Sequence, residues 1–238
     1  SIFFVPMKIK NYWLYEPLGG GGMGSVYHAF HERNPSAEFA IKILPRSRKN
    51  DAELIETLIG EAEIGSIFGD HPHVSKVYEY GCFDGEYFAA YEYIEGLRLD
   101  RIIESPLRRT DKEILLWALQ ILSAEQHMFD HGYLFRDLKP QNVIIDGKGN
   151  VKLIDFGLAM KVEDAITEGN SNTITGSPYY MPHERIAGHP EGQYSEIYSL
   201  GMLLYHMIAR QTYYSTEDIN SLVEKHIMSP QMLNIAVK

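Results

Sequence analysis

The chain has 238 residues, of which 45% are hydrophobic and 23% are charged, so it has the composition of a globular protein with one sizeable core or two small lobes. Its formal net charge of −10 argues against a nucleic-acid binder, which would carry a basic face. No segment is long and uncharged enough to cross a membrane, and Cys82 is the only cysteine, so no internal disulfide can form. We therefore predict a cytoplasmic protein, or the cytoplasmic domain of a larger one, with Cys82 buried as a structural thiol.

Strand signals dominate the first part of the chain. Short apolar runs between glycine, proline and polar turns predict strands over residues 12–18, 25–31, 38–44, 74–83 and 87–94. Apolar residues at helical spacing predict a helix over residues 52–68. We therefore expect residues 1–95 to form a small β-rich lobe with one helix.

The rest of the chain is predicted to be mainly helical. Helices are expected over residues 111–131, 193–209 and 219–227, and a strand hairpin over 143–146 and 151–154. Thr110 is a suitable N-cap for the first of these helices. The prediction is an α+β fold of two lobes, the second being residues 96–238, with a ligand bound between them.

A glycine-rich stretch lies between the first two predicted strands. It consists of Leu18, Gly19, Gly20, Gly21, Gly22, Met23 and Gly24. Glycine lets backbone N–H groups approach phosphate oxygens without a Cβ in the way. The stretch continues as a strand, which argues against a Rossmann fold, and it lacks the Gly-Lys-Ser/Thr ending of a Walker loop. A phosphate-binding hairpin is predicted, and a glycine hairpin that binds nothing is the alternative.

Lys42 stands inside an apolar predicted strand. A buried ammonium is costly unless a carboxylate pairs with it. Glu61 on the following helix is the best candidate and Glu63 is the alternative, because the two lie on different faces of that helix. Held in this way Lys42 would bind phosphates, whereas an edge lysine that reaches solvent is the other interpretation.

Two dense polar segments, Arg-Asp-Leu-Lys-Pro-Gln-Asn and Asp-Phe-Gly, flank the predicted hairpin. Phosphoryl transfer needs metal ligands, a carboxylate that orients the attacking hydroxyl and a cation near the transferred group. Asn142 and Asp155 offer the hard oxygen ligands that Mg²⁺ prefers. Asp137 can accept the hydroxyl proton, and Lys139 can stabilise the moving phosphoryl group.

In this order, the glycine-rich loop, Ala-Ile-Lys and the two polar segments resemble the signature of the eukaryotic-type protein kinases, over about residues 12–227. The run Gly-Gly-Met-Gly-Ser-Val-Tyr is similar to the bacterial serine/threonine branch, and Lys139 also resembles serine/threonine rather than tyrosine kinases. The resemblance implies transfer of the γ-phosphate of ATP, with Mg²⁺ or Mn²⁺, to serine or threonine hydroxyls of protein substrates. It implies no nucleic-acid partner and no membrane contact within this segment, and it leaves homodimerisation open.

The resemblance also implies an adenine pocket. Besides the glycine-rich loop and Lys42, the implied ATP contacts are Val26, Ala40, Tyr91, Glu92, Tyr93, Ile94 and Ile144. Tyr91 would be the gatekeeper that narrows the back of the pocket. The backbone of the next three residues would be the hinge that hydrogen-bonds adenine.

Arg136, just before the catalytic aspartate, resembles kinases that are switched on by activation-loop phosphorylation. A phosphate on that loop would pair with this arginine. Thr173 and Thr175 are the candidate sites, with Ser171 and Thr167 behind them. A polar loop that is never modified is the alternative.

The chain departs from the family pattern at several positions. Phe135 replaces a histidine, Glu196 replaces an aspartate that braces the catalytic loop, and Gly65 stands where the family has a larger side chain, four residues after Glu61. The helical lobe is also predicted to lack its last two helices. These departures keep a kinase-like binding or scaffold module as the alternative function. A small-molecule kinase is disfavoured, because Phe-Arg-Asp-Leu-Lys replaces the His-Gly-Asp-x-His of those enzymes.

Overall fold

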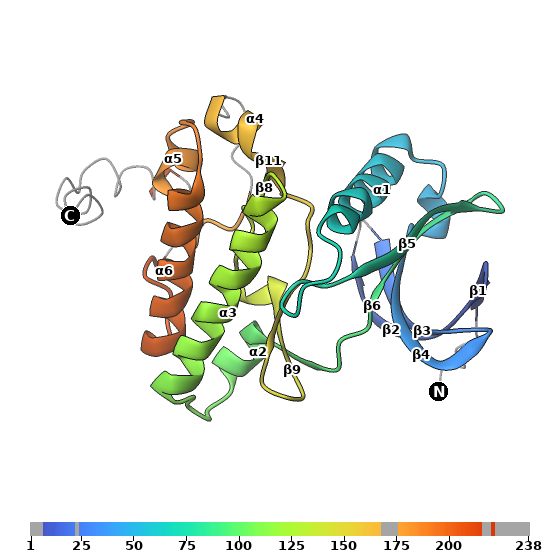
Figure 1. Cartoon of the computed structure of the whole chain (residues 1–238), viewed down its shortest axis with the longest axis horizontal. Coiled ribbons are helices and arrows are strands. Elements are labelled where there is room, and N and C mark those ends of the chain that lie inside the picture. Colours follow the sequence, from blue (N-terminus) through green and yellow to red (C-terminus); the bar gives the residue numbers. More distant parts are fainter. Residues whose placement is uncertain (1–6, 22–23, 168–175, 216–219, 222–238) are drawn as a thin grey trace. The chain divides into compact units, whose positions relative to one another are not determined.

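The computed structural model describes residues 7–21, 24–167, 176–215 and 220–221 (Figure 1). It divides into two compact units. The first is Ser1–Gly96 together with Ile154–Gly157, and the second is Leu97–Leu153 together with Leu158–Lys238. The short segment Ile154–Gly157, which contains the Asp-Phe-Gly motif, thus belongs with the β-rich unit.

The first unit is built on a six-stranded antiparallel sheet with the strand order β1-β2-β3-β4-β6-β5. The strands are β1 (Met7–Ile9), β2 (Tyr12–Gly21), β3 (Gly24–His31), β4 (Asn34–Ile43), β5 (Val77–Phe83) and β6 (Glu86–Glu92). Because side chains alternate along a strand, the sheet has two different faces. One face carries a buried apolar cluster that includes Leu14, Ile41 and Phe88.

Helix α1 (Ala52–Ile67) packs on the other face of this sheet through Leu54, Leu58 and Ala62. It follows the 3₁₀ helix η1 (Arg46–Arg48). The side chain of Asp51 caps the helix by accepting hydrogen bonds from the backbone N–H groups of its first turn. The apolar spacing of the sequence and this cap together fix where the helix lies and where it begins.

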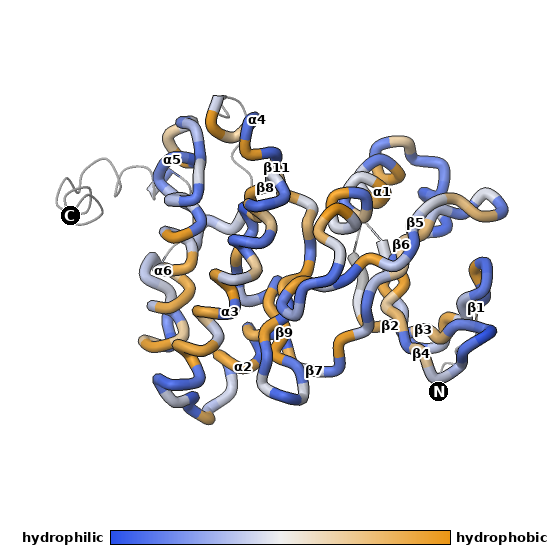
Figure 2. Tube along the Cα trace, in the orientation of Figure 1, coloured by the Kyte–Doolittle hydropathy of each residue, from blue (hydrophilic) through white to orange (hydrophobic). Residues whose placement is uncertain are grey.

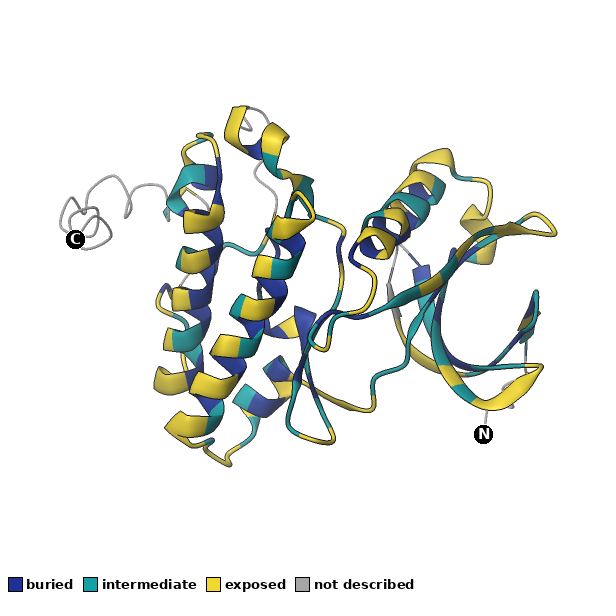
Figure 3. Ribbon diagram, viewed as in Figure 1, coloured by how far each residue is buried: buried dark blue, intermediate teal, exposed yellow. Residues whose placement is uncertain are grey.

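The second unit is mainly helical, and its longest helices are α3 (Asp111–Asp130) and α6 (Gln193–Ala209). Their buried faces lie against each other (Figure 3), and hydrophobic stretches run along both (Figure 2). Thr110 caps α3, as the sequence predicted, and it does so in a capping box with Glu113. The shorter elements are β7 (Gly96–Arg98), α2 (Leu99–Glu104), β8 (Tyr133–Leu134), η2 (Pro140–Asn142), β9 (Val143–Asp146), β10 (Val151–Leu153), β11 (Met160–Lys161), α4 (Val162–Thr167) and α5 (His183–Ile186).

The β9–β10 hairpin is held to α3 by two polar side chains. The indole N–H of Trp117 donates to the carbonyl of Gly149, and the Gln120 side chain bonds both Asn150 and the backbone N–H of Val151. These bonds fix the hairpin, and the catalytic-loop residues directly precede it in the chain. The hairpin itself is the one predicted from the sequence.

The α+β organisation, with a β-rich part followed by a helical part, is confirmed. Two local predictions are wrong. The strand expected from residue 74 begins at Val77, because Val74 is tied instead into an isolated bridge with His71. Cys82 is exposed rather than buried, since it lies on an edge strand of the sheet. The helix expected over residues 219–227 falls almost wholly outside the described residues. Among the described helices, none is both long and apolar enough to cross a membrane.

Candidate functional site

The glycine-rich stretch forms the closed end of the β2–β3 hairpin in the first unit. Gly19 pairs with Val26, and the backbone pairing continues to Gly21 opposite Gly24. Gly24 has φ +153°, and a Cβ there would lie 2.6 Å from the carbonyl oxygen of Ile43, so only glycine fits. Leu18 is exposed beside this hairpin. Gly22 and Met23 lie outside the described residues.

Several predicted pocket residues of the first unit share one face of its sheet. Val26 lies opposite Lys42, which in turn lies opposite Ala89, and Ala40 lies opposite Tyr91. Directly paired residues project to the same side of a sheet, and every second residue of a strand does so too. This is the face on which α1 packs, because Ala89 and Tyr91 both belong to the apolar cluster beneath that helix.

Lys42 is paired with Glu61 across this face. Its Nζ lies 3.1 Å from Oε2 of Glu61, whose side chain is only 7% exposed. Burial raises the pKa of Glu61, and the carboxylate of Asp155 raises it further, while Lys42 opposes the shift. Glu63, the alternative partner, is exposed on another side of α1.

Asp155 lies in the first unit near this ion pair, as its effect on the pKa of Glu61 shows. It is exposed and takes up a left-handed backbone conformation, with φ 70°, which is strained for a residue with a side chain. Its Oδ1 accepts a hydrogen bond from the backbone N–H of Gly157 at 3.0 Å. The hydroxyl of Tyr91 is buried close by, and burial together with the charges of Glu61 and Asp155 raises the pKa of Tyr91.

The position of Gly65 is filled by the side chain of Phe156. A Cβ on Gly65 would lie 2.7 Å from Phe156 Cδ2 and 2.7 Å from Val77 Cγ2. The Phe156 ring also packs edge-on against Phe68, with 5.5 Å between centroids. The glycine that sequence reasoning treated as a defect therefore lets the aromatic ring of Asp-Phe-Gly lie directly on α1.

The predicted hinge residues end β6 and continue beyond it. The backbone N–H of Glu92 donates to the carbonyl of Lys76 at 2.8 Å, and the Tyr93 ring stacks on His28 at 3.7 Å between centroids. Ile94 follows, outside the strand and partly buried. Ile144 belongs to the second unit, where it is half-buried on β9 opposite Lys152.

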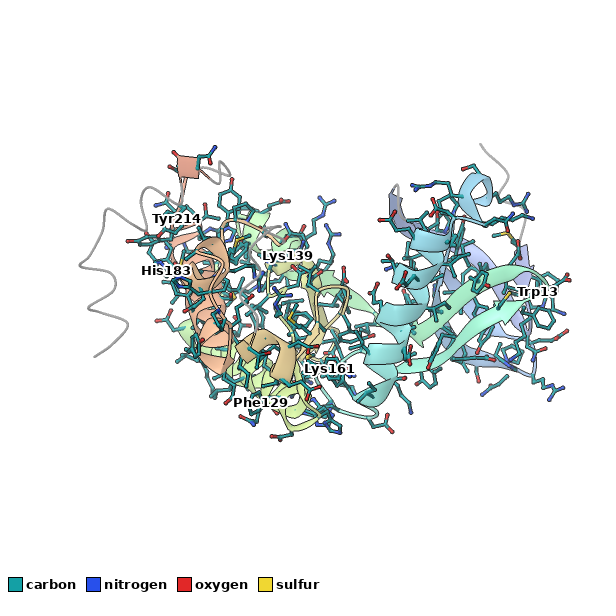
Figure 4. The ribbon with its side chains drawn as sticks, turned by 90° about the horizontal axis from the view of Figure 1, so that it is seen from above. Trp13, Phe129, Lys139, Lys161, His183 and Tyr214 are labelled. Atoms are coloured by element: carbon teal, nitrogen blue, oxygen red, sulfur yellow. The ribbon has the colours of Figure 1, made fainter. Side chains whose placement is uncertain are left out.

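The catalytic-loop residues meet in the second unit. The Asn142 side-chain N–H groups donate to the Asp137 carbonyl at 2.8 Å and to Asp137 Oδ2 at 2.9 Å. Lys139 Nζ lies 3.8 Å from Asp137 Oδ1 (Figure 4 labels Lys139). Asp137 and Asn142 are both buried, and these hydrogen bonds hold their side chains in place. The bonds use the N–H groups of the Asn142 amide, so its side-chain oxygen remains available to a ligand.

A buried carboxylate braces the same loop from α6. Glu196 Oε1 accepts hydrogen bonds from the backbone N–H groups of Phe135, at 2.5 Å, and Arg136, at 3.2 Å. Arg136 has a left-handed φ of 67°, so the carboxylate holds a strained backbone conformation next to Asp137. Phe135 is fully buried. The glutamate thus makes the bracing contacts that the family resemblance assigns to an aspartate.

Buried charges around this loop were missed by sequence reasoning. Arg136 pairs with Glu191, which also pairs with Arg185, and Glu125 lies buried on α3 beside Glu196. For Glu125 the sequence offers one signal, which is a charged residue at an apolar position of a helical pattern. Glu191 has no local signal, because its partners are distant in the chain. Thr173 and Thr175 lie outside the described residues.

Comparisons with known proteins identify the family of the chain. The sequence model of the protein kinase domain matches residues 12–238. The chain is 34% identical to the serine/threonine-protein kinase PrkC of Bacillus subtilis over 92% of its own length and 33% of that relative. It is 29% identical to the probable serine/threonine-protein kinase PknB of Lactococcus lactis, over 94% of this chain and 36% of the relative. It is 32% identical to the serine/threonine-protein kinase PknA of Mycobacterium tuberculosis, over 92% and 52%. The chain thus spans about a third to a half of the length of these relatives.

Proposed function

The chain belongs to the protein kinase domain family, as its sequence motifs predicted, and we propose on that basis that it transfers the γ-phosphate of ATP to serine or threonine hydroxyls of protein substrates. The observation that carries the proposal is the 3.1 Å ion pair between Lys42 and Glu61. A lysine held by a buried carboxylate is placed to bind phosphate oxygens, because the ion pair restrains its ammonium group.

The proposed roles follow from the two groups of contacts. In the first unit, Lys42 binds the phosphates, and Val26, Ala40 and Tyr91 on the same sheet face enclose adenine. The backbone of the glycine hairpin covers the phosphates, and the residues after β6 bond the adenine edge. In the second unit, Ile144 lies under the ring. These roles extend the family resemblance to this chain residue by residue.

Asp137 would act as the proton acceptor. The substrate hydroxyl oxygen forms a bond to the γ-phosphorus while the bond to the bridging oxygen of ADP breaks, and the hydroxyl proton passes to the Asp137 carboxylate. Asn142 holds that carboxylate in place through its 2.9 Å hydrogen bond. Lys139 stabilises the negative charge of the group in transfer.

The donor chemistry of Asn142 and Asp155 fits a divalent metal. The exposed Asp155 carboxylate and the free Asn142 side-chain oxygen are hard ligands, and Mg²⁺ usually binds one or two such groups while keeping several waters. When bound, the metal would neutralise phosphate charge. Among the described residues there is no cluster of three His, Cys, Asp or Glu side chains that would favour zinc or calcium instead. We propose that this metal is Mg²⁺, for which Mn²⁺ can substitute.

We also propose that the chain acts in the cytoplasm, where ATP is available.

A transfer assay on the 238-residue chain tests this function. The expected result is transfer of labelled phosphate from Mg-ATP to a generic protein such as casein, with phosphoserine or phosphothreonine as the product. Asp137→Asn is the matched control, since it keeps the size of the side chain and one acceptor oxygen for Asn142 but removes the carboxylate that takes the proton, and it should lower kcat by about 10²–10³-fold. ATP binding without any Asp137-dependent transfer would instead identify a kinase-like binding module.

A further inference from the structure

Three charged side chains form a buried cluster in the second unit, and none of them is among the residues assigned to ATP. Arg136 comes from the catalytic loop, Arg185 from α5, and Glu191 from the segment that leads into α6. Arg136 Nη2 lies 2.9 Å from Glu191 Oε2, and Arg185 Nη2 lies 2.8 Å from Glu191 Oε1. The three side chains are 3–5% exposed.

Each oxygen of the Glu191 carboxylate receives more than one hydrogen bond. The Nε groups of both arginines also donate to it, at 3.3 Å from Arg136 and 3.2 Å from Arg185. Charged hydrogen bonds of this forked kind are both strong and directional. Burial alone would raise the pKa of Glu191, but the bonds to Arg185 and Arg136 outweigh it and lower that pKa. The carboxylate is therefore ionised at neutral pH, and it accepts hydrogen bonds from both arginines.

The cluster ties together the segments that surround the catalytic aspartate. Arg136 Nη1 donates to the carbonyl of Leu158, and the backbone N–H of Glu191 donates to the carbonyl of Ala165 in α4. Gly176, with φ +113°, passes so close to Arg185 that a Cβ would lie 2.7 Å from Nη1. Glu191 is thereby bonded to α4, which precedes residues 168–175, while Gly176, which follows them, lies close to Arg185.

Arg136 is the residue that, by the family resemblance, would pair with a phosphate on the activation loop. Its Nε and Nη2, the fork that would bind a phosphate, are occupied by Glu191. We propose that Glu191 is a positioning residue that takes the place of an activation-loop phosphate, so that this chain's catalytic loop is set without phosphorylation. This inference rests on the proposed kinase function and concerns its regulation.

The same contact has a rival interpretation, which the experiment must separate. Glu191 could be a lock that sequesters Arg136 until a phosphate displaces it. The two interpretations predict opposite effects of removing the Glu191 charge. A positioning carboxylate makes the unphosphorylated chain active and its loss harmful, whereas a lock makes the unphosphorylated chain inactive and its loss activating.

The test compares three forms of the chain: the chain as purified, the chain treated with a protein phosphatase, and a variant with alanine at all four candidate sites. That variant carries Thr167→Ala, Ser171→Ala, Thr173→Ala and Thr175→Ala. We expect the phosphatase-treated chain and the alanine variant each to keep at least about half of the kcat of the purified chain. Glu191→Gln should lower kcat by about tenfold or more, with KM for ATP within about twofold, because the loop and not the nucleotide pocket is disturbed. Glu191→Asp should restore part of the loss. Glu163→Gln, which changes an exposed carboxylate of α4, is the matched control and should change neither constant.

Hydrogen exchange of residues 135–142 gives a readout that does not depend on activity. The dephosphorylated chain should protect these amides as well as the phosphorylated chain does, and Glu191→Gln should lose protection there. Transfer or protection that appears only after phosphorylation would overturn the inference, as would an increase of kcat in Glu191→Gln. Absence of Asp137-dependent transfer in every form would refute the proposed function instead, and the exchange data would then decide whether Glu191 holds the loop. The phosphatase and alanine arms need no change at Glu191, so they stand even if Glu191→Gln fails to fold.

Discussion

The two units support their functional residues by different physical means. In the first unit, the ion pair of Lys42 and Glu61 is backed by apolar packing, and Phe156 fills the space that Gly65 leaves. In the second unit, buried carboxylates hold the segment before Asp137. Glu196 accepts a hydrogen bond from the backbone N–H of Phe135, and Glu191 forms an ion pair with Arg136. We therefore expect the packing around Lys42 and Phe156 to be sensitive to changes of side-chain volume. The loop around Asp137 should be sensitive to changes of charge.

The largest effect is expected on activity when Lys42 is removed. Lys42→Ala should lower kcat by about 10²–10³-fold, because the variant lacks the cation that Glu61 holds in place for the phosphates. The fold should survive: Lys42 is 28% exposed, and Glu61, whose pKa is already raised by burial, can take up a proton when its partner is lost. Activity and the Tm of the variant measure the two parts of this prediction.

Lys49→Ala serves as the control for that variant, because it removes an exposed lysine of the same unit. It should leave both transfer and Tm unchanged. Activity of Lys42→Ala close to that of the parent chain would show that the phosphates are bound elsewhere. A collapse of Tm would show that the ion pair is structural.

The next effect is on stability and tests the role of volume in the first unit. Gly65→Ala should destabilise the chain by about 1–3 kcal/mol, because the new methyl group overlaps Phe156 and Val77. Gly60→Ala is a matched control in the same helix, since a Cβ there meets nothing within 4 Å. It should stabilise the chain by about 0.5–1 kcal/mol through helix propensity alone. Urea unfolding of both variants measures the contrast, and equal shifts would contradict the proposed packing of Phe156 on α1.

How far the sequence predicts this molecule depends on how local the cause is. Helix α3 and its Thr110 cap follow from spacing and a capping box, and so does the hairpin after the catalytic loop. Cys82 was misplaced because strand periodicity does not say which strand ends at the sheet edge. The pairing of Arg136 with Glu191 joins residues 55 positions apart, and no local pattern carries that information.

Gly65 is a second case in which the cause lies far along the chain. Its low helix propensity is visible in the sequence, but the aromatic ring that needs its space comes from Phe156, far along the chain. Lys42, Asp137 and Asn142 could be predicted as site residues because their motifs are dense and ordered. The structure brings Lys42 to Glu61 and Asn142 to Asp137, each pair within its own unit.

The smallest expected effect concerns charge in the second unit and appears as a dependence of stability on pH. Glu125 is buried on α3, and neither of its carboxylate oxygens has a hydrogen-bond donor among the described residues. Its neighbour is the carboxylate of Glu196, so the two can share a hydrogen bond only if one carries a proton. Burial, and then the charge of Glu196, raise the pKa of Glu125 well above its usual range.

The sign of the dependence follows from that direction. A carboxyl whose pKa is raised in the folded state stabilises the fold while it stays protonated, and this contribution is lost as the pH rises through the raised pKa. Tm of the parent chain should therefore fall by about 2–4 °C as the pH rises from the ordinary pKa of a glutamate through the raised pKa of Glu125. Glu125→Gln keeps a donor for Glu196 without a titrating proton, so its Tm should change less over the same range. Glu191 acts in the opposite direction, because its lowered pKa gives stability that is lost as the pH falls through the acidic range. Thermal scans over a wide pH range should thus show two losses in the parent chain, one as the pH falls and one as it rises through the raised pKa of Glu125. Glu125→Gln should show only the loss at low pH. An unchanged loss with rising pH in that variant would show that the proton does not reside on this pair.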